Sequence, residues 1–257
     1  MKLIITDKTK KDSFIALFQL LKNCSNAVNI TINDDFMYIQ GMDKAHICLF
    51  EIHIVKSWFE TYEKTAGDSS HICIPINIFH SILAFVQDSQ SIIIHYEGDD
   101  IEHIHIDLLG SGSKDVNKYF TIPLIELDCD LLNIPDIDYD AEFSMNAKKV
   151  NDIVSQLMMF GDNMSIKCSE EEIFMGSSGQ EGEMHVNIPI DDLNEFSINE
   201  GDSIDLSYSL HNVYKLCLSN KLSTIIEFAI SKDSPMRIKY DLGNDSYIRF
   251  FIAPKIE

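Results

Sequence analysis

The stretch Asn146–Leu157, NAKKVNDIVSQL, decides the fold class. From Val150 to Leu157 its apolar residues follow the spacing i, i+3, i+4, i+7, which places one apolar stripe along a helix. Asn146 stands where a helix N-cap is expected. The same apolar template recurs elsewhere in the chain, starting at Phe14, Phe79 and Leu210. The sequence therefore predicts four short amphipathic helices, with Ser207 or Ser209 as a possible cap of the fourth.

These four templates repeat at about half the chain length. The third starts 136 residues after the first, and the fourth starts 131 residues after the second. Most segments between them alternate apolar and polar residues, as in Ile101–Ile106 and Met236–Tyr240, and this alternation is typical of strands. The pattern predicts an α+β protein made of two similar domains, each with two helices laid on antiparallel sheets.

A turn-rich stretch, Gly110–Asp115, and an extended segment with two prolines lie near the middle of the chain. Such a composition is typical of a connector between domains. We expect an N-terminal domain over residues 1–118, a connector over 119–136 and a C-terminal domain over 137–257.

The composition indicates a globular protein with a sizeable core, because 45% of the 257 residues are hydrophobic. No nucleotide-binding or hydrolase motif occurs, so a non-enzyme is favoured and no catalytic residue or cofactor is predicted. His95, His103 and His105 can share a sheet region, but solvated histidines are the commoner outcome and no metal site is predicted. The six cysteines are scattered, which fits a reducing, intracellular compartment. No stretch is apolar enough for a signal peptide or a membrane span.

The charges are distributed unevenly. The chain has 20 Lys+Arg against 41 Asp+Glu, a formal net charge of −21. The four helical windows 8–22, 75–87, 146–160 and 208–221 nevertheless hold eight lysines and two acids. Helices of net positive charge in an acidic protein suggest a shared face toward an anionic partner. The alternative is that lysines simply favour helix surfaces.

Four segments resemble the proliferating cell nuclear antigen family, the eukaryotic-type DNA sliding clamps. Gly41–Leu49 contains the Met-Asp-x-x-His motif, Leu127–Pro135 matches the family's connector, and Asp233–Tyr240 is followed by Tyr247–Glu257, which ends in Ala-Pro-Lys-Ile-Glu. The similarity can be followed along the whole chain.

The resemblance implies a homotrimer whose two-domain subunits close a pseudo-sixfold ring, with helices lining the hole and curved sheets outside. Its expected function is that of a processivity factor for DNA replication and repair. It would encircle double-stranded DNA without reading its sequence and tether DNA polymerase. A clamp loader and a nuclear location are also implied, and no membrane partner is expected.

The helix lysines are the expected phosphate contacts. They are Lys10, Lys11, Lys22, Lys148, Lys149, Lys215 and Lys221. The chain departs from the family at the second helix, which has His80 but no lysine, and at Ser155 and Met159 of the third helix. The lining should therefore be less positive than is typical. Glu170 stands where many members carry a lysine that is modified by ubiquitin.

The resemblance also implies a pocket that binds partner peptides carrying a glutamine, an aliphatic residue and two aromatic residues. Flap endonuclease and DNA ligase are partners of this kind. The matching positions are Met42, His46, Ile47, Leu49, Leu132, Ile134, Pro135, Pro235, Phe251, Ile252, Ala253 and Pro254.

Two other functions compete with this one. The chain could be a scaffold subunit of a mixed ring with no direct polymerase role, or an enzyme that uses its many carboxylates or its strand histidines. A homotrimer favours the replicative clamp, and a stable monomer favours the mixed ring.

Overall fold

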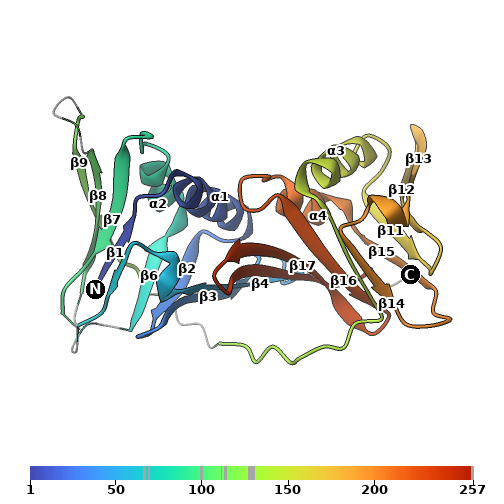
Figure 1. Ribbon diagram of the computed structural model, residues 1–257, viewed down its shortest axis with the longest axis horizontal. Helices are drawn as coiled ribbons and strands as arrows, with labels where there is room; N and C mark the ends of the chain where they lie inside the picture. The colour runs from blue at the N-terminus through green and yellow to red at the C-terminus, as the bar shows by residue number, and fades with distance from the viewer. Residues whose placement is uncertain are drawn as a thin grey trace. The chain divides into compact units, whose positions relative to one another are not determined.

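A computed structural model describes residues 1–65, 68, 70–98, 101–110, 112, 115–126 and 131–255 (Figure 1). The described chain forms two compact units. Unit 1 comprises residues 1–44, 50–132 and 242–248, and unit 2 comprises residues 45–49, 133–241 and 249–257. Parts of the predicted turn at 110–115, the predicted connector and the chain end at 256–257 lie outside the described residues.

Unit 1 is built around two helices, α1 (Lys8–Cys24) and α2 (Ile76–Leu83), with a short 3-10 turn, η1 (Lys56–Trp58). Its strands are β1 (Lys2–Ile5), β2 (Ala27–Ile32), β3 (Phe36–Met42), β4 (Cys48–Val55), β5 (Thr61–Glu63), β6 (His71–Pro75), β7 (Gln90–His95), β8 (His103–Gly110) and β9 (Lys118–Pro123). The first residues of the segment predicted as a connector therefore form strand β9. The predicted domain boundaries stay a prediction.

Unit 2 has helices α3 (Ala147–Leu157) and α4 (Leu210–Cys217) and a 3-10 turn, η2 (Ile190–Asp192). Its strands are β10 (Ala141–Asn146), β11 (Asn163–Cys168), β12 (Ile173–Gly179), β13 (Gly182–Ile188), β14 (Glu195–Ile198), β15 (Ile204–Ser209), β16 (Ile225–Ser231), β17 (Ser234–Gly243) and β18 (Ser246–Ile252). Strands β4, β17 and β18 contribute residues to both units.

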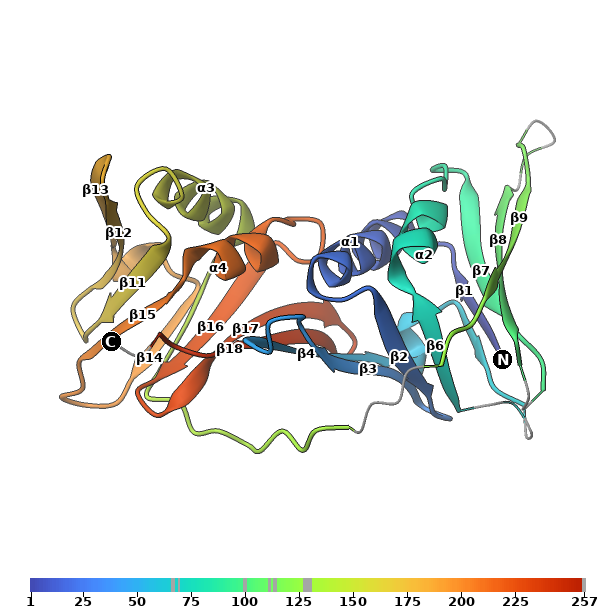
Figure 2. The same ribbon diagram turned by 180° about the vertical axis from the view of Figure 1, so that it is seen from behind.

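The order of elements is the same in the two halves of the chain. Each half has one strand, a helix, five strands, a second helix and three strands. The predicted duplication and the α+β class are thereby confirmed. Figures 1 and 2 show α1 beside α2 in unit 1 and α3 beside α4 in unit 2.

The strands of each unit form antiparallel ladders with equivalent orders. In unit 1 the orders are β5-β1-β7-β8-β9 and β4-β3-β2-β6. In unit 2 they are β14-β10-β16-β17-β18 and β13-β12-β11-β15. Strand β9 is thus the counterpart of β18, and β13 is the counterpart of β4. Both β9 and β13 lie at the end of a sheet.

The apolar stripes of the helices form the core of each unit. In unit 1 the rings of Phe14 and Phe79 both approach Phe18, at centroid distances of 5.0 and 4.7 Å. In unit 2 the Tyr240 hydroxyl donates to the Leu216 carbonyl at 2.6 Å and so ties β17 to α4. Burying each large apolar side chain stabilises the fold by about 1.5–3 kcal/mol, so these stripes anchor both helix pairs.

Helix α3 begins with a side-chain cap, as predicted. The Asn146 side-chain oxygen accepts from the backbone N–H groups of Lys148 and Lys149, at 3.0 and 3.3 Å. Of the two serines expected at the start of α4, Ser209 occupies the N-cap position, but its side chain forms no cap hydrogen bond. The first N–H of α4, on Leu210, donates to the Asp162 carbonyl at 2.9 Å.

This difference predicts unequal costs of cap removal. Asn146→Ala should lower the free energy of unfolding by about 1 kcal/mol, because two N–H groups at the start of α3 lose their acceptor. Ser209→Ala is the matched control and should change it by less than about 0.5 kcal/mol. Urea unfolding at one fixed protein concentration, followed by circular dichroism, measures both. Equal losses would contradict the assignment of Asn146 as the cap.

Candidate functional site

The lysines of α1 have different environments. Lys22 is exposed in the last turn, and Lys8 is exposed and forms an ion pair with Asp88 at 2.5 Å. Lys10 is half-buried: its Nζ donates to the Trp58 carbonyl at 2.5 Å and lies 5.5 Å from the centre of the indole ring. The side chain of Lys10 is therefore already engaged in unit 1.

Lys11 is a correction to the predicted set of DNA contacts. Its side chain lies inside unit 1, with 3% of the residue exposed. Its Nζ donates to the carbonyls of Asp88 and Gln90, at 2.8 and 2.5 Å. Lys11 thus ties α1 to the chain that enters β7 and has no surface from which to reach a phosphate. The sequence did not show this, because Lys11 is charged and adjacent to Lys10.

Helix α2 presents no lysine. Its exposed residues include Asn77 and Ile78, and Phe85 is exposed just beyond its end. Burial, followed by the nearby Lys22 charge, lowers the pKa of His80 below its usual value. The imidazole therefore stays neutral at pH 7, and the α2 surface adds no positive charge to unit 1.

The predicted lysines of unit 2 are more accessible. Lys148 and Lys149 are exposed in the first turn of α3, and Lys149 forms an ion pair with Asp192 at 2.8 Å, a contact that is itself solvent-exposed. Such pairs contribute little, so Lys149 can exchange this partner for a phosphate. Lys215 is half-buried on α4, and Lys221 is exposed in the loop that follows.

The segment that follows residue 130 is held by a side chain that sequence reasoning missed. The Gln40 side-chain amide, on β3, accepts from the Leu132 N–H at 2.6 Å and donates to the Leu132 carbonyl at 2.8 Å. The Leu132 side chain stays on the surface, 47% exposed. The sequence signal that could have drawn attention to Gln40 is its place directly before the Gly41-Met42 pair. That this polar residue is buried is visible only in the structure.

The other predicted docking residues are divided between the two units. Met42 belongs to unit 1 and is half-buried. The remaining ten lie in unit 2. There Ala253 N–H donates to the Ile47 carbonyl at 3.3 Å. His46 has φ 55°, a backbone conformation that non-glycine residues seldom adopt. Ile47 is 41% exposed.

Further members of the set in unit 2 range from exposed to fully buried. Pro135, Pro235 and Ala253 are exposed, and Leu49, Ile134 and Pro254 are half-buried. The Ile252 side chain is 0% exposed and belongs to the core, so only its backbone can belong to the predicted docking set, as expected for the segment Ile252–Pro254. Phe251, at 7%, is nearly as buried.

The described residues offer little for catalysis. The cysteines among them are buried, and burial raises the thiol pKa of Cys168 to about 11 and of Cys217 to about 12. Both therefore stay protonated at neutral pH. Within the described ranges, no group of three or more His, Cys, Asp and Glu side chains is placed to hold a metal ion. No described helix has the length and apolarity needed to cross a membrane.

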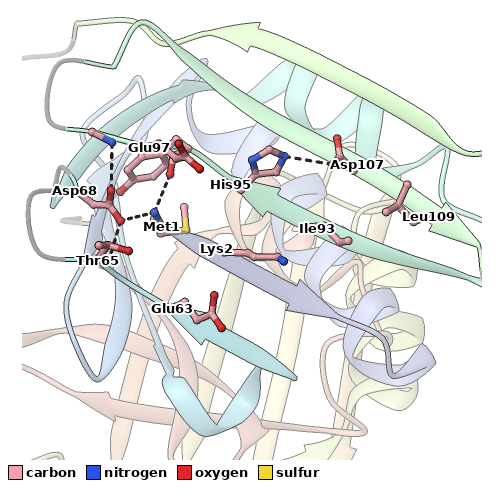
Figure 3. A pocket seen from close by; sticks show the side chains of 12 residues that line it. Met1, Lys2, Glu63, Thr65, Asp68, Ile93, His95, Glu97, Asp107 and Leu109 are labelled. Carbon is pink, nitrogen blue, oxygen red and sulfur yellow. Dashed lines mark hydrogen bonds and ion pairs between the residues drawn. The ribbon is translucent and has the colours of Figure 1, made fainter.

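A cavity of about 780 Å³ lies in unit 1, away from every predicted site residue (Figure 3). At one end the Met1 amino group is bound by Asp68 and by the Tyr96 carbonyl. The hydrogen bond from the Met1 amino group, helped by the backbone N–H groups of Thr65 and Gly98 and by the Met1 charge, lowers the pKa of Asp68, so this ion pair persists at neutral pH. At the other end His95 contacts Asp107 at 3.2 Å. No nucleophile with an adjacent base is found among the residues that line it.

Two repeats of a helix pair on antiparallel sheets define a duplicated α+β clamp fold. Comparison with known proteins agrees: the family model for the proliferating cell nuclear antigen N-terminal domain matches residues 8–132, and that for the C-terminal domain matches residues 133–255. The chain belongs to the proliferating cell nuclear antigen family. The division between the two matches falls where the described chain passes from unit 1 to unit 2, after Leu132.

The similar curated proteins span the whole chain at low identity. Proliferating cell nuclear antigen 2 of Plasmodium falciparum (isolate 3D7) is 24% identical over 254 residues, covering 95% of each chain. Proliferating cell nuclear antigen of Chaetomium thermophilum is 23% identical over 248 residues, covering 94% of this chain and 92% of the relative.

The two environments of the helix lysines yield a prediction. Lys11→Met should lower the free energy of unfolding by about 2 kcal/mol, because two buried carbonyls lose a charged donor. Lys148→Met is the matched control on a helix surface and should change it by less than about 0.5 kcal/mol. Urea unfolding at one protein concentration measures both variants. If the Lys11→Met variant were as stable as the parent, the buried role of Lys11 would be wrong, and Lys11 would again be a predicted phosphate contact.

Proposed function

We propose that the protein is a DNA sliding clamp, a processivity factor that encircles duplex DNA and tethers DNA polymerase and other replication and repair proteins. The observation that carries the proposal is the match of both halves of the chain to the two domains of the clamp family. A nuclear location and loading by a clamp loader belong to the same proposal.

The duplication of the fold supports a proposal for how subunits join. In unit 1 strand β4 adjoins β18: Val55 N–H donates to the Ser246 hydroxyl at 3.1 Å, and the His53 and Tyr247 rings stack. The counterparts of these strands are β13 and β9, and both end a sheet. We propose that β9 of one subunit pairs with β13 of the next. Such a head-to-tail contact closes a ring and covers two strand edges that would otherwise invite aggregation.

DNA contacts in the ring would be few and electrostatic. Lys22, Lys148, Lys149 and Lys221 are the exposed members of the predicted set, and Lys10 and Lys215 are half-buried. Lysine contacts to phosphate carry no sequence information. Because encirclement retains the DNA, weak contacts suffice and do not hinder sliding. The excess of acidic residues elsewhere in the chain would discourage DNA from binding to the outside.

Partner docking is proposed at the exposed and half-buried members of the predicted pocket set. Leu132 and Ile47 offer exposed apolar side chains, and Ala253 is also exposed. A partner peptide would insert its aliphatic and aromatic side chains against these residues as one helical turn. Ile252 contributes only its backbone to this proposal.

Assembly and primer extension test the clamp function. Light scattering of the purified chain should give three times the mass of one subunit, and the chain should lengthen the products of a polymerase on primed DNA when a clamp loader is present. Lys148→Glu with Lys149→Glu should reduce this effect without changing the mass. The salt dependence of direct DNA binding should also fall by about 2 in log–log slope, because two phosphate contacts are lost.

Lys167→Glu with Lys232→Glu is the matched control, because both lysines are exposed but lie outside the helices. It should leave product length unchanged. Equal losses in the two double variants would contradict a role for the helix surface. A stable monomer would favour the mixed-ring scaffold, and a sequence-specific footprint on free DNA would contradict the clamp function itself.

Docking has its own prediction. Leu132→Ala with Ile134→Ala should weaken binding of a synthetic peptide with the glutamine–aliphatic–aromatic pattern at least thirtyfold, because truncating one anchor typically costs about 2 kcal/mol. Calorimetry measures the affinity. Leu131→Ala is the control, since Leu131 is adjacent, 56% exposed and outside the predicted set. If the double variant folds, forms the trimer and binds the peptide unchanged, the docking site lies elsewhere.

A further inference from the structure

Gln40 and Leu132 are joined by two hydrogen bonds across 92 residues of sequence. The side-chain amide matches both groups of the Leu132 residue: its oxygen accepts from the N–H, and its NH₂ donates to the carbonyl. A neighbouring strand would bind the backbone in the same way. Strand β3 therefore binds this extended segment through a side chain.

No other contact of this kind holds the segment. Among residues 131–138, all of which the structure describes, Leu132 is the only one with a hydrogen bond to the described chain. The segment has no regular secondary structure there. Among the hydrogen bonds of this segment to the described chain, the two from Gln40 are therefore the ones that fix Leu132 relative to β3.

The orientation of the Gln40 amide is set by two further residues. Tyr38 O–H donates to Glu51 Oε1 at 3.1 Å, so the hydroxyl oxygen is left to accept the second Gln40 N–H, also at 3.1 Å. Burial, and then the Glu51 charge, raise the pKa of Tyr38, so the hydroxyl keeps its proton. The carboxylate thereby directs the Gln40 NH₂ toward the Leu132 carbonyl. If the Gln40 amide were reversed, its NH₂ would face the Leu132 N–H and its oxygen would face the Leu132 carbonyl, so neither hydrogen bond could form.

Burial distinguishes this network from an ordinary surface contact. Gln40 and Glu51 are each 8% exposed, whereas Leu132 is 47% exposed. The polar groups are shielded from competing water, which strengthens their hydrogen bonds. The apolar side chain that they hold remains available to a partner.

We propose that Gln40 is a positioning residue for partner docking: by binding both backbone groups of Leu132, it holds that side chain in the orientation that a partner peptide requires. The inference rests on the proposed function, because it assigns a cause to the geometry of the proposed docking site. Preorganisation of this kind improves affinity by removing the cost of ordering the segment during binding.

The test compares two substitutions at Gln40. Gln40→Met keeps the length of the side chain but can make neither hydrogen bond. Gln40→Glu keeps the shape but cannot donate to the Leu132 carbonyl. Both variants should bind the synthetic peptide about tenfold more weakly, equivalent to about 1.4 kcal/mol. Hydrogen exchange should show that the Leu132 amide loses its protection in Gln40→Met, whereas Gln40→Glu keeps an oxygen that can accept from this N–H and should retain more of it. The mass of the assembly should stay unchanged in both variants.

Two further variants complete the design. Tyr38→Phe leaves both Gln40–Leu132 bonds in place but removes the hydroxyl that orients the amide, so a smaller loss of about threefold is expected. Thr31→Val is the control: it removes the contact of the Thr31 hydroxyl with His71 on the adjacent strands and should change neither the exchange of Leu132 nor the peptide affinity.

Each contrary outcome identifies which statement fails. An unchanged exchange rate at Leu132 in Gln40→Met would show that Gln40 does not hold the segment. Lost protection with unchanged affinity would overturn the positioning role while leaving the docking site intact. Failure of the parent protein to bind the peptide would refute the proposed docking function, and the inference with it, before any Gln40 variant is measured.

Discussion

The burial of one apolar stripe per helix is the constraint on which the rest of the structure depends. Each helix is short, and a helix of 8 to 17 residues has little stability in isolation. It persists here because side chains such as Phe18 in unit 1 and Val154 in unit 2 are buried against the strands. With that stripe buried, the opposite face of each helix must meet solvent or a partner, and lysines can gather there.

Because the fold is duplicated, the two repeats have equivalent strands at equivalent sheet positions, and this equivalence is the basis of the proposed subunit contact. Strand β4 adjoins β18 within unit 1. Their counterparts in the other repeat, β13 and β9, each lie at the end of a sheet and have no such neighbour among the described strands. The charge distribution follows the same elements: the four helical windows are net positive, whereas the rest of the chain is strongly acidic.

The sequence predicted the fold well because hydrophobic period is a local property. The template at Val150–Leu157 became α3, and Asn146 caps it as expected. The fourth helix formed as well, with Ser209 at its N-cap position but without a side-chain hydrogen bond to the helix. The resemblance to the clamp family rested on short segments, and the match of both halves to the family models confirmed it.

What the sequence determined by itself was the set of elements, their repetition and the excess of positive charge in the helices, since all three follow from local pattern and composition. The tertiary structure decided which side chains are free to act. Lys10 and Lys11 are neighbours, yet only packing shows that the second is buried beneath the chain entering β7. Gln40 became visible as the residue that holds Leu132 only when folding brought together two positions 92 residues apart. Burial and long-range hydrogen bonds depend on the whole chain, and no local window contains them.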